Sequence, residues 1–233
     1  GFTGSDGRTF RESLTDASEA ICEAEELGTD VLLIHAGCRG GHTLGHARRL
    51  VQEALERLAP IAEEHGVRLA LKPTHPAASS GCGFFTDLAE AHQFVDEIGR
   101  PSIGLALDLW HFGDQRALLN LLPVIIRQVI VVSLADCRGA PTADHERLAP
   151  GDGTLPLDRI MAAIVDQGFQ GDVEFEFVAQ PGDPPRQGSS DDAAASLAAG
   201  YHEALRRARK AARSYGCLSG PAFGKLPAPA PGR

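Results

Sequence analysis

The sequence of 233 residues contains no apolar run that approaches the roughly 20 residues needed to span a bilayer. Its first 30 residues lack the basic start and the apolar middle of a secretory signal peptide. Its five cysteines are an odd number, are widely spaced and include no CxxC pair. These absences argue against a membrane protein and against a disulfide-rich secreted protein, and we expect a reduced, cytoplasmic protein.

Basic runs and phosphate-binding motifs are missing as well. The 22 Lys and Arg face 31 Asp and Glu, and the net charge of −9 disfavours nucleic acid as a partner, because phosphate neutralisation supplies much of such affinity. Neither GxGxxG nor GxxxxGK[ST] occurs, so we expect no nucleotide cofactor. The remaining composition, 43% hydrophobic and 23% charged, is typical of a globular protein. We expect one domain over residues 1–215 and a flexible Pro/Gly/Ala-rich tail over 216–233.

What the sequence does contain is a repeated alternation of short β-rich apolar runs and helical patterns. Continuous apolar strands alternating with helices predict a parallel sheet that is buried on both faces. The predicted strands are 31–34, 67–71, 103–107, 129–132 and 173–177. The predicted helices are 11–27, 50–62 with a kink or local break at Pro60, 86–98 with Thr86 as N-cap, 114–122, 155–168 and 191–214.

The positions of the ionisable residues distinguish between two folds that share this alternation. A doubly wound sheet would concentrate its site near one switch point, whereas the loops after all the strands build the site of a (β/α) barrel. Here an ionisable residue lies at or just past the carboxyl end of five consecutive strands, which favours the barrel. These residues are His35, Lys72, Asp108 with His111, Asp136 and Glu176.

Several of these residues allow more than one interpretation. Asp108 and His111 could share a cation or a substrate hydroxyl, or could be a turn cap and a surface histidine. Lys72 could be a buried amine that forms a Schiff base, or one half of a structural ion pair. Glu174 and Glu176 share a strand face, so both could point inward, or Glu174 could pair with a basic residue.

Other polar residues are weaker candidates. His35 and His75 could hold substrate oxygens, although a lone loop histidine is more often only hydrogen-bonded. Arg138 could place its guanidinium over a substrate oxygen or could pair with the neighbouring Asp136. Cys137 has no adjacent histidine that would make it a convincing nucleophile.

The ordered set of motifs resembles the sugar phosphate isomerase/epimerase family, the xylose isomerase-like TIM barrels. The matching segments run over about residues 10–178 and include LIHAG (33–37), EHGVRLAL (64–71), GLALDLWH (104–111), VVSLAD (131–136), PGDG (150–153) and GFQGDVEFE (168–176). The resemblance implies an N-terminally incomplete eight-stranded barrel in which the five predicted strands are the fourth to the eighth. An open sheet edge would favour association into a homo-oligomer.

The resemblance also implies a metal site and shows where this chain departs from it. Members hold one divalent cation, Mn, Co, Zn or Mg, with a Glu, an Asp, a His or Gln and a second Glu after strands five to eight. The corresponding residues here are Lys72, Asp108, Ser133 and Glu176. The two family glutamates also form the acid/base pair, and only Glu176 remains of that pair. We therefore expect the Lys72 ammonium to lie between Asp108 and Glu176 and to replace the charge of the metal.

The function that the resemblance implies is proton transfer on a small sugar, polyol or hydroxy-carbonyl compound by an isomerase or epimerase, with a lyase as the near neighbour. Two alternatives remain open: a catalytically inactive relative that binds a sugar-like ligand or a partner, and a metal-free Schiff-base enzyme that uses Lys72. The residues expected to take part are Glu176 and Lys72 in catalysis, Asp108 and Glu176 in binding any metal, and His35, His75, His111 and Arg138 in binding substrate.

Overall fold

The computed structural model describes residues 1–78, 83–142 and 147–176. Five strands form one parallel sheet in the order β1-β2-β3-β4-β5. The strands are β1 (Val31–Ile34), β2 (Arg68–Leu71), β3 (Ile103–Asp108), β4 (Val129–Leu134) and β5 (Asp172–Phe175). Each strand pairs with the next one along the chain and the order never reverses, as it would in a doubly wound sheet. The expected (β/α) barrel topology is therefore confirmed.

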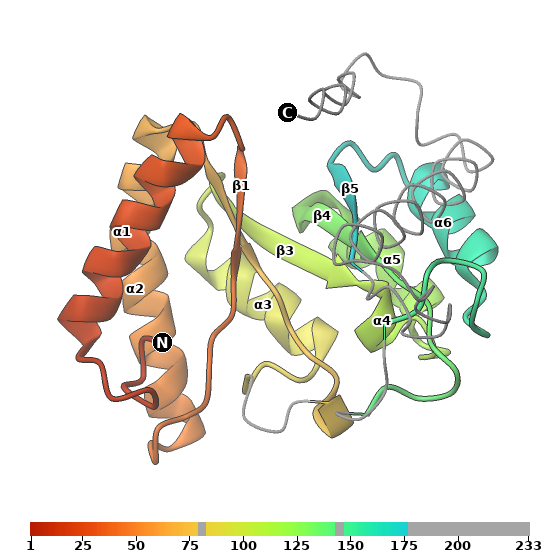
Figure 1. Cartoon of the computed structure of the whole chain (residues 1–233), viewed down its shortest axis with the longest axis horizontal. Helices are drawn as coiled ribbons and strands as arrows, with labels where there is room; N and C mark the ends of the chain where they lie inside the picture. The colour runs from red at the N-terminus through yellow and green to blue at the C-terminus, as the bar shows by residue number, and fades with distance from the viewer. Residues whose placement is uncertain (79–82, 143–146, 177–233) are drawn as a thin grey trace, which may run out of the picture.

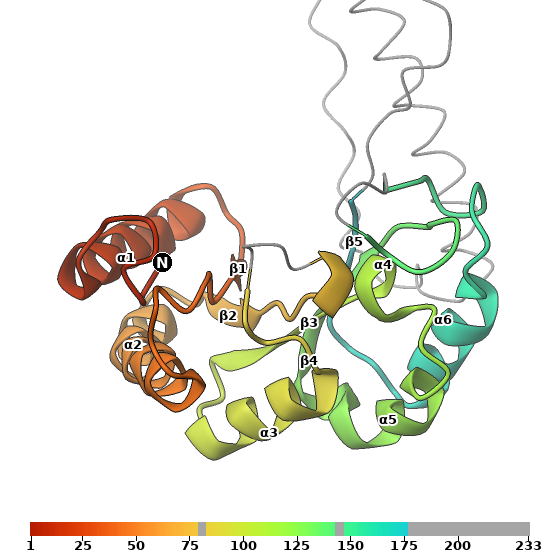
Figure 2. The same cartoon turned by 90° about the horizontal axis from the view of Figure 1, so that it is seen from below.

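The helices cover the outer, convex side of this sheet. They are α1 (Phe10–Glu26), α2 (Leu44–Glu64), α3 (Leu88–Ile98), α4 (Leu109–Phe112), α5 (Leu118–Ile125) and α6 (Leu157–Asp166), with short 3₁₀ turns η1 (Pro76–Ala78) and η2 (Ile126–Gln128). Figure 1 shows the sheet between the α1–α2 pair at one end and α6 at the other. In Figure 2 the five long helices follow an arc with the strands inside it, so the described chain has the shape of a half-barrel.

Two of the three apolar clusters in the described residues lie on the two faces of the sheet. The larger one lies between the sheet and the helices, where large side chains such as Phe94, Leu105 and Leu107 are at most 1% exposed. The smaller one, on the other face of the sheet, contains Ala70, Ala106, Ile130 and Val131 and is flanked by half-buried residues of β1. Because both faces of the central strands are apolar, these strands are continuous hydrophobic runs in the sequence.

Helix starts are set by side chains that accept backbone hydrogen bonds. Thr9 and Glu12 form a capping box at the start of α1, and Thr43 caps α2. The predicted cap Thr86 is wrong by one residue, because Asp87 accepts the hydrogen bond from Glu90 N at 2.9 Å. A carboxylate at this position also interacts favourably with the helix dipole.

Proline 60 does not break α2, contrary to one of the two expected outcomes. The helix continues as one element from Leu44 to Glu64. Pro60 removes one hydrogen bond at a cost of about 3 kcal/mol. The same helix buries Val51, Leu55 and Leu58 to 1% exposure or less, and each such side chain contributes about 1.5–3 kcal/mol. Packing of the apolar face therefore outweighs the lost hydrogen bond.

Several expectations lie at or beyond the limits of the described residues. The helix predicted over 191–214 and the tail over 216–233 are outside them. Among the residues that are described, no helix is long and apolar enough to cross a membrane.

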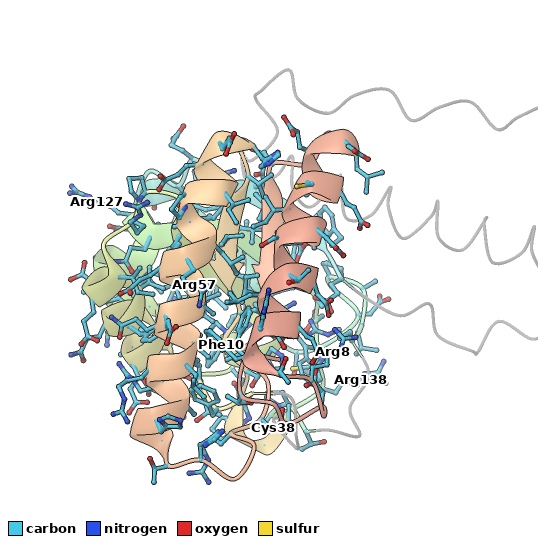
Figure 3. The ribbon with its side chains drawn as sticks, turned by 90° about the vertical axis from the view of Figure 1, so that its left-hand side faces the viewer. Arg8, Phe10, Cys38, Arg57, Arg127 and Arg138 are labelled. Carbon is cyan, nitrogen blue, oxygen red and sulfur yellow. The ribbon has the colours of Figure 1, made fainter. Side chains whose placement is uncertain are left out.

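On the outer surface, the Arg57 guanidinium of α2 lies 5.9 Å from the ring centroid of Phe10 in α1, and this contact links the first two helices (Figure 3).

Gly104 in β3 provides a test of the packing between strands. A Cβ at this position would lie 2.5 Å from Ile130 Cγ1 and closer still to the Gln128 carbonyl oxygen. We expect Gly104→Ala to lower the free energy of unfolding by about 1–3 kcal/mol, measured by urea denaturation. Gly45→Ala in α2 is the matched control, because its Cβ would meet only Arg49 Nη1 at 3.9 Å and alanine favours the helix. Equal stability of the two variants would contradict the tight contact at Gly104.

Candidate active site

Lys72 lies at the centre of a buried ionic cluster at the carboxyl ends of the strands. It follows β2, and its side chain is 2% exposed. Its Nζ lies 3.0 Å from Asp108 Oδ2 at the end of β3 and 2.5 Å from Glu176 Oε2 just after β5. Three strand ends thus deliver one ammonium and two carboxylates to one point, as the sequence predicts.

Arg147 is the second cation of this cluster. Its Nη1 and Nη2 atoms donate to the two oxygens of Asp108 at 3.2 and 2.8 Å, and its Nε lies 3.4 Å from Glu176 Oε1. Its guanidinium carbon also lies 4.7 Å from the ring centroid of Trp110. This planar fork binds the carboxylate with both arms, which a lysine could not do. We call Lys72, Asp108, Arg147 and Glu176 the four-charge cluster.

The loop that carries Arg147 is anchored by Asp136. The backbones of Asp136 and Leu148 exchange two hydrogen bonds, at 2.8 and 2.9 Å. The Asp136 carboxylate, in a residue only 1% exposed, accepts hydrogen bonds from the backbone N–H groups of Gly151 and Leu155 at 3.0 Å. Asp136 therefore acts through the loop, which it holds so that Arg147 points at Asp108.

Asp108 is fully buried, yet it remains ionised. Burial by itself would raise the pKa of its carboxyl group. The hydrogen bonds from Arg147 and the charges of Lys72 and Arg147 outweigh this effect and hold the pKa below its usual value. With both oxygens occupied by cations, Asp108 is a structural counter-ion in the cluster and has no free lone pair directed at solvent.

His111 lies beside the cluster and is neutral. Burial, more than the opposing effect of Asp108, lowers the pKa of His111 to about 4. Its Nδ1 accepts a hydrogen bond from His75 N at 3.2 Å, and its Nε2 lies 3.4 Å from Arg147 Nη2 and 3.9 Å from Asp108 Oδ2. Burial and the charge of Lys72 also lower the pKa of His35, which follows β1. The structure thus brings three of the predicted histidines to this rim.

Two other predicted residues have different partners. Arg138 is exposed and donates to the Asp152 carbonyl oxygen at 3.4 Å. Ser133 is fully buried, and its hydroxyl donates to the Glu174 carboxylate. Ser133 pairs in register with both Asp108 and Glu174, so Glu174 points to the inner face as one alternative predicted, with a serine instead of a basic residue as its partner.

The residues at this rim do not fit a divalent cation. Asp108 is occupied by Lys72 and Arg147, and Lys72 stands at a position where the resemblance implies a metal ligand. The hydroxyl of Ser133 is committed to Glu174. Within 1–78, 83–142 and 147–176, no group of three His, Cys, Asp or Glu side chains could hold a metal ion. Lys72 and Arg147 already provide positive charge at this point, so a metal would have to displace them.

A family model described as the xylose isomerase-like TIM barrel matches residues 1–212 of the chain. The chain belongs to this family. Among curated members, the inosose isomerase of Halalkalibacterium halodurans is 28% identical over 134 residues, which are 55% of this chain and 46% of that protein. The fructoselysine 3-epimerase of Shigella flexneri is 27% identical over 76% of this chain and 62% of that protein. The chain thus spans about half the length of the inosose isomerases it matches.

Two solved structures have a similar fold. The crystal structure of protein SMc04130 from Sinorhizobium meliloti is 27% identical with a TM-score of 0.66, over 84% of this chain and 72% of that one. A crystal structure of the IOLI protein with a bound zinc atom is 19% identical with a TM-score of 0.68, over 88% of this chain and 70% of that one. The second likeness concerns the fold alone.

The depressed pKa of His111 predicts a pH-dependent stability. Between pH 6.5 and 4 the unfolded chain binds a proton at this histidine and the folded chain does not, so stability falls as the pH falls through this window. We expect His111 to account for a loss of up to about 3 kcal/mol over the window. Denaturation of the wild type and of His111→Asn, which keeps an acceptor for His75 N, measures it. A constant difference between the two proteins over this pH range would contradict the buried neutral ring.

Proposed function

We propose that the protein is a sugar isomerase that moves a proton between neighbouring carbons of a small polyhydroxylated carbonyl compound without a metal ion. Family membership and the names of the curated relatives, inosose isomerases and a fructoselysine 3-epimerase, support the substrate class. The observation that carries the proposal is the position of Glu176, a carboxylate with a side chain 45% exposed that lies against the buried Lys72 and the half-buried Arg147.

The two cations would stabilise the negative charge that such a reaction creates. Removal of a proton next to a carbonyl group gives an enediolate, whose charge lies on oxygen. Lys72 and Arg147 provide fixed N–H donors at one point, and their side chains are 2% and 16% exposed. In such a water-poor place each hydrogen bond to a developing oxyanion is stronger than in bulk water. Lys72 and Arg147, the two cations of the four-charge cluster, would thus act as the electrophile.

Glu176 would be the single base. Asp108 is fully buried and both of its oxygens are occupied, so it does not reach a substrate carbon. One base suffices for an aldose–ketose isomerisation, because it can take the proton from one carbon and return it to the next on the same face of the enediolate. An epimerisation inverts a carbon and needs a proton from the opposite face. The cluster therefore favours isomerisation over epimerisation.

The Schiff-base alternative fits the arrangement less well. A lysine forms an imine only when its nitrogen can reach a carbonyl carbon, and Nζ of Lys72 is engaged by two carboxylates at 3.0 and 2.5 Å. The inactive relative is the second candidate, because the four charges satisfy one another without a ligand.

Under either candidate function we place the protein in the cytoplasm, in keeping with the widely spaced cysteines.

Hydrogen exchange in D₂O separates the active from the inactive candidate. The purified chain is incubated with ketohexoses and with an inosose, and loss of the proton next to the carbonyl is followed by NMR. We expect exchange in at least one compound, and a rate at least about 100-fold lower in Glu176→Gln, because the base is lost. Exchange that persists in Glu176→Gln would assign the proton transfer to another group. Binding without exchange in the wild type would establish the inactive relative.

Replacement of the internal cation tests the metal-free arrangement. Lys72→Glu would place a third carboxylate beside Asp108 and Glu176, and oxygen ligands of this kind bind Mn²⁺ and Zn²⁺. We expect calorimetric titration to show at least about tenfold tighter binding of these ions than in the wild type. Lys72→Met, which removes the charge without adding a ligand, should bind no better than the wild type. Equal metal affinity in the wild type and in Lys72→Glu would refute the role of Lys72 as the internal cation.

A further inference from the structure

A second group of reactive side chains lies at the amino ends of the strands, opposite the rim that holds the four-charge cluster. Cys22 and Glu25 lie near the end of α1, and His65 is the C-cap of α2. Cys22 Sγ lies 3.6 Å from His65 Nε2, and His65 Nδ1 lies 2.6 Å from Glu25 Oε2. Both helices end next to the amino ends of β1 and β2, so this Cys22 triad lies away from the four-charge cluster. Proton transfer at Glu176 does not use it.

The order of contacts fixes where the protons lie. An ionised carboxylate only accepts, so the Nδ1 of His65 carries a hydrogen that it donates to Glu25. The other ring nitrogen, Nε2, then faces the sulfur and can receive the thiol proton. Glu25 stabilises the imidazolium that results, as the third group of a catalytic triad does. The thiolate is the nucleophilic form of cysteine, and an adjacent His⁺ favours it.

The triad is accessible to small reagents. Cys22 is half-buried, and the side chains of His65 and Glu25 are 25% and 56% exposed. Cys137 is a contrasting case, because it is buried, donates to the Gly139 carbonyl oxygen at 3.0 Å and has its pKa raised to about 11 by burial. Cys38 shares the half-buried class of Cys22, but it lies at the other end of the α1–α2 pair, where α1 begins (Figure 3).

We propose that Cys22 is a modification site that forms mixed disulfides with small, neutral or cationic disulfides. The Cys22 thiol gives its proton to His65 Nε2, and the thiolate attacks one sulfur of the reagent. The reagent S–S bond breaks as the new bond to Cys22 forms, and the leaving thiolate takes the proton back from His65. One disulfide is consumed and one is formed, so no further oxidant is needed.

The charge preference follows from the neighbouring side chains. Glu19, Glu25 and Glu26 lie three positions before and three and four positions after Cys22, and therefore surround it on one face of the helix. These carboxylates repel an anionic reagent and attract a cationic one. Cystamine is thus the matched probe, and the anionic glutathione disulfide is its counterpart.

The test measures the rate of mixed-disulfide formation at each cysteine of the full chain by mass spectrometry of its peptides. Because His65 Nε2 lies beside the Cys22 sulfur and can take its proton, we expect cystamine to modify Cys22 at least about tenfold faster than Cys38. Glutathione disulfide should react more slowly than cystamine at Cys22. His65→Gln should lower the Cys22 rate to about that of Cys38, and Glu25→Gln should lower it by less.

A loss of structure in the variants would not produce the expected result. If His65→Gln loosened the α1–α2 contact, Cys22 would become more exposed and would react faster, not more slowly. Glu25→Gln changes a side chain that is mostly exposed and is the milder second variant. A Cys22 rate equal to that of Cys38, or a rate unchanged in both variants, would overturn the proposal.

Discussion

The burial of the Asp108 carboxylate is the constraint on which the carboxyl-end rim depends. An unpaired carboxylate in this position would cost several kcal/mol, and the site tolerates it because an ammonium and a guanidinium contact its two oxygens. Each cation then needs its own placement: Lys72 follows β2, and Arg147 is held by the loop that Asp136 anchors. Lys72 and Arg147 also contact Glu176. The buried Asp108 therefore orients the exposed Glu176 through the two cations that they share.

The parts of the rim that follow strand ends could be predicted from the sequence. Lys72, Asp108 and Glu176 each come directly after or at the end of a strong β-rich run, and parallel strands bring their carboxyl ends to the same edge. Arg147 could not be predicted, because it lies in a polar loop without periodicity and is positioned by backbone contacts to Asp136. Its signal in the sequence is indirect: a buried strand-end aspartate followed by a Gly-rich loop that returns to it.

The wrong predictions arise where tertiary packing overrides the conformational preference of a few neighbouring residues. Pro60 suggests a break when it is considered with its neighbours alone, whereas the buried face of α2 carries the helix past it. Thr86 and Asp87 are both good caps, and the backbone path into α3 selects the second. The Cys22 triad joins residues 43 positions apart, and only the way in which α1 packs on α2 determines that contact.

The four-charge cluster also has a consequence for how the chain folds during its synthesis. Lys72 and Glu176 are separated by 104 positions, so the ribosome must synthesise more than a hundred further residues before the ammonium meets its second carboxylate. Until β5 docks, the partial sheet ends at β4 and Lys72 has only its neighbour Asp108 within that sheet. Contacts of such long range form late, after the local helices. The ion pair between Lys72 and Glu176 therefore forms only once β5 has paired with β4.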